Sequence, residues 1–182
     1  MPGGATTSLR KDGLSKSPVA YLDFTVNGTR LLEQLHAHAA ENLDYVGVIQ
    51  DAWPVETVAA IERLLGQCPG DLPDGRVSLY VCPECGRLGC GALTARVALE
   101  HDTVTWRAIG IQTDYEEDIL AFGDADDFPD IAFERSSYEH VLRRELARVR
   151  PLTVGFEYPY QRERRLRRKR LTRLLRRLIR RG

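Results

Sequence analysis

The sequence predicts an α+β fold, in which an antiparallel sheet made of a three-stranded meander and N-terminal strands packs with about three helices. Segments of alternating apolar and polar residues, typical of strands, are interspersed with segments whose apolar residues have helical spacing. The strands predicted at 76–82, 91–100 and 103–111 follow one another through short connections, as antiparallel neighbours do. With 43% hydrophobic and 29% charged residues, the 182-residue chain is not a disordered, collagen-like or multi-pass membrane protein.

The first forty residues predict a disordered start, a strand and a helix. Residues 1–18 are rich in Gly, Ser, Thr and Pro, and we expect them to be disordered. Residues 21–26 alternate between apolar and polar side chains, and the Asn27-Gly28 pair favours a turn directly after them. Apolar residues at helical spacing then predict a helix over 29–41. These residues are Leu31, Leu32 and Leu35.

A second strand and a second helix precede the meander. Residues 45–50 form an apolar run that predicts a strand buried on at least one face. Pro54 suits the first turn of a helix, where a missing N–H costs nothing, and Gly66 suits its end. The predicted apolar stripe of this helix is Val55, Val58, Ile61, Leu64 and Leu65. Residues 66–75 predict a loop.

After the meander, the sequence predicts an acidic loop, a short strand and a helix. Residues 114–130 contain eight acids without the ligand spacing of an EF-hand, so we expect a solvated loop. A short strand is expected around Ile131 and Phe133. Ser136 and Glu139 have the spacing of a capping box at the start of the helix. Its predicted apolar stripe is Tyr138, Val141, Leu142, Leu146 and Val149, and Pro151 predicts its end at or before Arg150.

Charge divides the chain into a body and a tail. The net charge is zero, but residues 1–160 carry 14 basic against 25 acidic residues, whereas residues 161–182 carry 12 against one. We therefore expect a single α+β domain over 19–150, followed by a linker and a basic tail over 151–182.

The tail predicts a basic amphipathic helix. Within residues 164–181, five aliphatic residues have helical spacing and the remaining face is covered with arginine. They are Leu171, Leu174, Leu175, Leu178 and Ile179. Such a helix can bind an anionic membrane surface or nucleic-acid phosphates, and the aliphatic stripe favours a membrane or the groove of a partner over DNA. The alternatives are that the tail folds onto the acidic body or has no function.

The chain contains four cysteines, namely Cys68, Cys82, Cys85 and Cys90. Residues 1–18 lack the apolar region of a secretory signal, and no apolar run reaches the ~18 residues of a membrane span. We therefore expect a cytoplasmic protein without a transmembrane segment, whose thiols stay reduced. A metal site or free thiols then suit these cysteines better than disulfides do.

The segment CPECGRLGCG, which begins at Cys82, has the form of a zinc knuckle. Two thiolates three residues apart can share one metal ion if the backbone turns between them. Pro83 favours that turn, and Gly86 lets the chain pass the second ligand in a conformation that a side chain would obstruct. Cys90 can then return as a third ligand. The sequence thus predicts a structural zinc site with Cys82, Cys85 and Cys90 as ligands.

The fourth ligand has two candidate sources of equal standing. One is Cys68, and the other is the acidic loop after strand 103–111, which returns toward the cysteines. The candidates in that loop are Asp114, Glu116 and Glu117. His101 is opposed by geometry, because ten strand residues at about 3.3 Å each place it roughly 33 Å from the turn.

Two other interpretations of the turn remain open. As a C-x-x-C motif, it also fits a thiol-dependent oxidoreductase, although three glycines after Cys85 argue against the helix that usually activates such a thiol. The turn can also be a metal-free element packed on the sheet. Whether the protein is an enzyme stays open, and no catalytic residue can be assigned, since the common nucleophile and nucleotide-binding motifs do not occur.

The stretch LYVCPECGRLGCGALTARV, together with the strand that carries Trp106, resembles a family of small, uncharacterised actinobacterial proteins. Members of this family often carry the name oxidoreductase. The resemblance covers residues 76–111 and is compatible with about 20–150, but it excludes the basic tail. It implies that the CPECG..GCG turn is a family hallmark, and it does not say whether that hallmark is catalytic, metal-binding or architectural.

Overall fold

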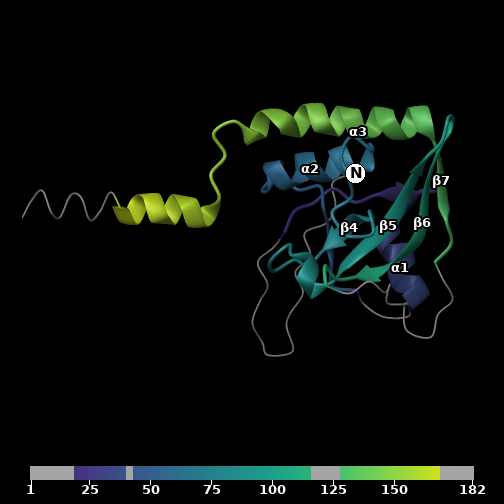
Figure 1. The fold of residues 1–182 in the computed structure, drawn as a ribbon, viewed down its shortest axis with the longest axis horizontal. Helices are drawn as coiled ribbons and strands as arrows, with labels where there is room; N and C mark the ends of the chain where they lie inside the picture. Colours follow the sequence, from purple (N-terminus) through teal and green to yellow (C-terminus); the bar gives the residue numbers. More distant parts are fainter. Residues whose placement is uncertain (1–18, 40–42, 116–127, 169–182) are drawn as a thin grey trace, which may run out of the picture.

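A computed structural model, which describes residues 19–39, 43–115 and 128–168, has an α+β fold with two antiparallel sheets (Figure 1). The larger sheet has five strands in the order β3-β4-β5-β6-β7. Its strands are β3 (Val46–Gly47), β4 (Val77–Val81), β5 (Ala92–Leu99), β6 (Thr103–Gln112) and β7 (Ile131–Glu134). The predicted meander is therefore confirmed as β4-β5-β6, and the strands at 45–50 and near Ile131 extend it on either side.

The helices of the body match the predicted ones in number and order. They are α1 (Leu31–Ala39), α2 (Pro54–Leu64) and α3 (Arg135–Val149). Helices α2 and α3 lie side by side and both contact the sheet, whereas α1 lies apart from them (Figure 1). Two 3-10 turns, η1 (Leu88–Cys90) and η2 (Arg150–Thr153), complete the body, and a further helix occupies residues 159–168.

The predicted strand at 21–26 is shorter than expected and belongs to a separate hairpin. Its strands are β1 (Thr25–Val26) and β2 (Thr29–Arg30). Asn27 and Gly28 connect them with positive φ angles of 52° and 84°, the conformation of the two-residue turn that suits the twist of a hairpin. Toward the N-terminus, Leu22 makes only an isolated bridge to Ile49.

Two bulges bend the large sheet around a buried arginine. One shift of register lies in β4, and the other lies in β6, where Ala108 adopts a φ of +49°. Arg76, which is 0% exposed, directly precedes β4 and binds residues of β5 and β6 beside these shifts. Its Nε donates to Thr94 Oγ1 (2.9 Å), and its Nη2 donates to the carbonyl oxygens of Thr94 (2.9 Å) and Ala108. Arg76 thus joins the start of β4 to both β5 and β6.

An aromatic cluster joins the sheet to the two packed helices. Trp106, on β6, is 1% exposed and contacts the rings of Phe24, Phe133 and Tyr138. Its Nε1 donates to the Tyr138 hydroxyl of α3 (3.2 Å), which in turn donates to the Leu64 carbonyl of α2 (3.0 Å). The polar atoms of the buried rings are therefore satisfied, as a dry core requires.

The start of α3 differs from the predicted capping box. The N-cap residue is Glu134, whose carboxylate accepts hydrogen bonds from the backbone N–H groups of Ser136 (3.0 Å) and Ser137 (2.7 Å). These bonds hold the pKa of Glu134 at about 2, well below its usual range. Glu139 instead forms ion pairs with arginines one turn away on either side. The prediction failed because the helix begins at Arg135, so that Ser136 lies inside its first turn and Glu134, at the end of β7, takes the N-cap position.

The apolar stripes of α2 and α3 are narrower than predicted. Val55 and Val141 are 40% and 49% exposed, although both belong to the predicted stripes. In α2 the buried face includes Thr57, whose hydroxyl binds backbone atoms of Gln50. The predicted end of α3 is confirmed, because the helix stops at Val149, directly before the turn that contains Pro151.

Candidate metal centre

The cysteine turn is the connection between the central strands β4 and β5. Cys82 directly follows Val81 of β4, and Gly91 directly precedes Ala92 of β5, so that the turn begins and ends beside the pair Val81–Ala92. Gly86 and Gly91 adopt positive φ angles of 62° and 86°, which residues with a side chain rarely adopt. The conformation expected at Gly86, which a side chain would disfavour, is therefore confirmed.

The three predicted sulfurs converge. The Sγ atoms of Cys82, Cys85 and Cys90 all lie within 4.8 Å of one another, and those of Cys85 and Cys90 are 3.4 Å apart. Three thiolates around tetrahedral zinc, at about 2.3 Å from the metal, stand roughly 3.8 Å from one another. Cys85 and Cys90 are exposed and Cys82 is half-buried. The cluster is therefore accessible and close to the spacing that a metal ion needs.

The pKa values of the Cys85 and Cys90 thiols are shifted in opposite directions. The backbone N–H of Arg87 donates to the Cys85 sulfur and lowers the pKa of this thiol. The hydrogen bond to Cys85, together with the charge of its neighbours, raises the pKa of Cys90 to about 11. In the metal-free cluster the Cys85 thiol, with its lowered pKa, therefore loses its proton more readily than the Cys90 thiol does. A bound cation would remove the proton from each coordinating sulfur, because metal ligands are thiolates.

The candidates for the fourth ligand lie at opposite ends of the sheet. Asp114 lies beside the turn, since a Cβ placed on Gly89 would stand 3.3 Å from its Oδ1. Cys68 follows Gly66, on which a side chain would collide with Leu99 at the far end of β5. His101 also lies at that far end, in the connection from β5 to β6. The two further acids, at 116 and 117, lie outside the described residues.

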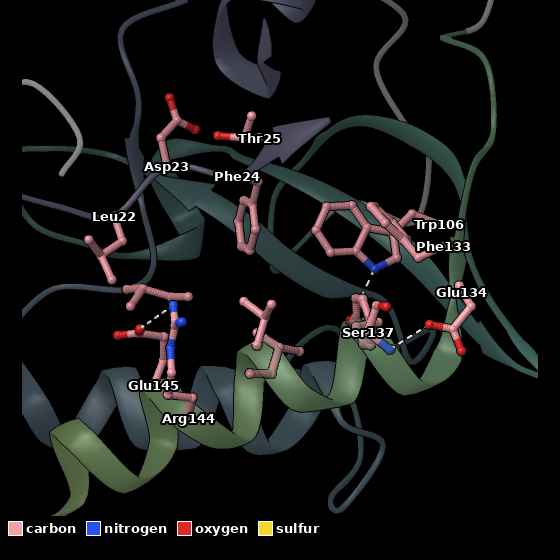
Figure 2. A pocket seen from close by; sticks show the side chains of 14 residues that line it. Leu22, Asp23, Phe24, Thr25, Trp106, Phe133, Glu134, Ser137, Arg144 and Glu145 are labelled. Atoms are coloured by element: carbon pink, nitrogen blue, oxygen red, sulfur yellow. Dashed lines mark hydrogen bonds and ion pairs between the residues drawn. The ribbon is translucent and has the colours of Figure 1, made fainter. Parts of the chain in front are cut away.

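A groove of about 470 Å³ lies between the N-terminal segment and α3 (Figure 2). Leu22 and Phe24 point into it toward α3, whereas Asp23 points away, where it accepts a hydrogen bond from the Tyr80 hydroxyl. Glu134, at one end, is engaged as the helix cap. Both of these carboxylates are therefore engaged in hydrogen bonds within the protein.

The start of the C-terminal segment contains an aromatic cluster that the sequence did not indicate. The ring of Tyr158 stacks on Tyr160 (5.5 Å between centroids) and contacts Phe156 (5.1 Å) and Trp53 (6.2 Å). Trp53 directly precedes α2, about one hundred residues earlier in the chain. The rings stand at the base of the exposed helix over 159–168, which carries five arginines and one glutamate. The aliphatic stripe predicted at 171–179 lies outside the described residues.

No protein-family model matches the chain, and no curated protein or solved structure matches it either. Among the described residues, no helix combines the length and the apolar composition needed to cross a bilayer.

Proposed function

We propose that this protein is a non-enzymatic α+β module whose cysteine turn holds one structural zinc ion. The observation that carries the proposal is the convergence of Cys82, Cys85 and Cys90 within 4.8 Å on one exposed turn. Zinc is bound by thiolates in tetrahedral sites and has no redox chemistry of its own, which suits a site with an architectural role. We also propose that the protein is a member of the actinobacterial family that it resembles. A cytoplasmic location is part of the same proposal, because thiols stay reduced there.

The position of the turn favours a structural role for the metal. A metal held by residues on both sides of the turn would tie the end of β4 to the start of β5, the two strands at the centre of the sheet. Since such a site forms only when the chain folds, the free energy of metal binding adds to the free energy of folding.

Redox chemistry by the same cysteines has weaker support. Oxidoreductases of the C-x-x-C type lower the pKa of their first thiol by placing it at the N-terminus of an α-helix. Here the C-x-x-C segment is followed only by the three-residue η1, and the thiol with the lowered pKa is the second cysteine, Cys85. Its lowered pKa comes mainly from a single backbone N–H of Arg87. The same arrangement suits a thiolate ligand.

Elemental analysis tests the zinc proposal directly. We expect the full chain, purified without chelator, to carry about one zinc ion per molecule. Cys85→Ser should weaken zinc binding by more than the roughly 10–100-fold that loss of an outer-shell partner costs. Cys68→Ser is the matched control, because it removes a thiol at the far end of β5, and it should bind zinc like the unaltered protein.

Two results together would contradict the zinc proposal. These are a purified protein without zinc, even after zinc is added, and a melting temperature that chelator leaves unchanged. If Cys85 were in addition alkylated much faster at neutral pH than Cys68, the thiol-dependent oxidoreductase would become the better interpretation.

We also propose that the C-terminal segment associates with an anionic membrane surface. The aromatic cluster favours this partner, because tryptophan and tyrosine concentrate at the interface between lipid and water. Tyr160 and Trp53 are 65% and 38% exposed, and Val154 nearby in the chain is 85% exposed. The arginines of the helix over 159–168 supply the charge that anionic headgroups attract.

Vesicle sedimentation tests the membrane proposal. We expect binding to vesicles that contain phosphatidylserine and none to vesicles of phosphatidylcholine alone. Deletion of 161–182 should abolish binding, and Tyr160→Ala should weaken it several-fold. Tyr115→Ala is the matched control, because Tyr115 is equally exposed (71%) but lies beside the cysteine turn. Binding that survives the deletion, or binding to single-stranded RNA without any to vesicles, would refute the proposal.

A further inference from the structure

We infer that Asp114 is the fourth ligand of the metal, so that the site consists of three thiolates and one carboxylate. The inference rests on the proposed zinc site and decides between the two sources that the sequence leaves open.

The pairing of β5 with β6 brings Asp114 to the third cysteine. Ala92 pairs with Gln112 at the end of the two strands. Two further residues in the same antiparallel register place Cys90 opposite Asp114. The contact at the neighbouring residue agrees with this register, because a Cβ on Gly89 would stand 3.3 Å from Asp114 Oδ1. The carboxylate therefore lies against the backbone of the turn, next to the residue that carries the third sulfur.

The Asp114 side chain is free to turn toward the metal. It is exposed, and it forms no hydrogen bond or ion pair with the described residues. Its oxygens do not belong to the group of atoms that lie within 4.8 Å of one another, which consists of the three sulfurs. Ligation therefore requires rotation of the side chain, and no existing interaction has to be broken. Zinc accepts a carboxylate oxygen at about 2.0–2.2 Å beside thiolates at about 2.3 Å.

The remaining candidate, Cys68, is too distant. It follows Gly66, which packs against Leu99, whereas the cysteine turn adjoins Ala92 at the other end of β5. Seven residues of strand, at about 3.3 Å each, separate these ends by roughly 23 Å. The loop from Gly70 to Gly75 packs on itself at the start of β4, which is again the end remote from the turn. A thiol at 68 therefore cannot close the site without unfolding this loop.

A carboxylate ligand gives the site a distinct metal preference. Thiolates are soft ligands and select soft metals, whereas a carboxylate is hard and favours harder ions. A site with three thiolates and one carboxylate should therefore discriminate less strongly in favour of cadmium over zinc than a site with four thiolates. The variant Asp114→Cys converts the first set into the second, and so provides a gain-of-function test.

The experiment is a competition titration of the full chain with zinc, cadmium and cobalt. We expect Asp114→Ala to lower zinc affinity by more than the roughly 10–100-fold that loss of an outer-shell partner costs, as expected for Cys85→Ser. Asp114→Cys should restore zinc affinity, raise the preference for cadmium and increase the thiolate-to-cobalt charge-transfer absorption. Glu84→Ala is the matched control, because it removes a carboxylate from within the same turn, and it should leave zinc affinity and the cobalt spectrum unchanged.

The outcomes separate the inference from the proposal on which it rests. If Asp114→Ala binds zinc like the unaltered protein and its cobalt spectrum does not change, Asp114 is not a ligand, although the three-cysteine site stands. If Glu84→Ala weakens binding instead, the fourth ligand lies within the turn and the inference is overturned. If the unaltered protein binds none of the three metals, the zinc site itself fails. Equal melting temperatures of the metal-free variants would show that the substitutions leave the fold intact.

Discussion

Replacement of Arg76 by alanine is expected to lower the free energy of unfolding by about 3–5 kcal/mol, the cost of breaking a buried charged network on one side. The substitution leaves the Thr94 hydroxyl and the carbonyl oxygens of Thr94 and Ala108 without their donor. Each buried polar group without a partner costs about 1–3 kcal/mol, and these costs are not additive. The substitution also leaves a cavity beneath the two bulges.

Urea denaturation followed by circular dichroism measures this loss. Arg96→Ala is the matched control, because the Arg96 side chain is 63% exposed and its ion pair with Asp74 is long, at 4.0 Å. This substitution should change stability by no more than about 0.5 kcal/mol. The loss of stability caused by Arg76→Lys should lie between the losses caused by Arg76→Ala and Arg96→Ala. Lysine keeps the charge but lacks the planar guanidinium group that reaches two strands. A loss below about 1 kcal/mol for Arg76→Ala would show that water replaces the guanidinium.

Replacement of Trp106 by alanine is expected to cost a similar amount, about 3–5 kcal/mol, as large-to-small substitutions of buried aromatic residues do. Trp106 is 1% exposed, and three rings from separate parts of the chain contact it. The substitution also removes the donor to the Tyr138 hydroxyl, on which the link from α3 to α2 depends.

Two further variants separate the packing of Trp106 from its hydrogen bond. Tyr138→Phe removes the hydroxyl but keeps the ring, and it should cost about 1–3 kcal/mol, because it leaves the Trp106 N–H and the Leu64 carbonyl unpaired. Trp53→Ala is the matched tryptophan control, since Trp53 is 38% exposed, and should cost about 1 kcal/mol or less. Equal losses for Trp53→Ala and Trp106→Ala would contradict the description of Trp106 as part of the buried cluster that joins the sheet to α2 and α3.

Local patterns explain which features the sequence predicts correctly. The strands of the meander alternate or are apolar throughout, so their pairing follows from short connections. The convergence of Cys82, Cys85 and Cys90 is equally local, because their spacing and the glycines between them determine the turn. The ends of α2 and α3 follow from Gly66 and Pro151, which act on the residues beside them.

The features that the sequence does not predict depend on contacts between distant segments. The partners of Arg76 lie 18 and 32 residues away, and nothing near Arg76 in the sequence indicates that it is buried. The choice of Asp114 over Cys68 requires the register of β5 with β6, which spacing alone does not determine. Trp53 reaches Tyr158 only because the chain after α3 returns to the start of α2. The N-cap role of Glu134 could be predicted only if the residue at which β7 ends were already known.

The placement of the cysteine turn also bears on the order in which the sheet assembles. The turn closes the β4–β5 hairpin through about ten residues, and a loop of that length closes in tens of nanoseconds at a small entropic penalty. By contrast, α2 and the loop after it separate β3 from β4 in the chain. The pair Val46–Val81 therefore forms only when a much longer loop closes. The β4–β5 hairpin, like the β5–β6 hairpin that residues 100–102 connect, is therefore expected to form before β3 joins the sheet. A metal ion bound by the three thiols of the unfolded chain would hold the end of β4 beside the start of β5 before the edge strands β3 and β7 join the sheet.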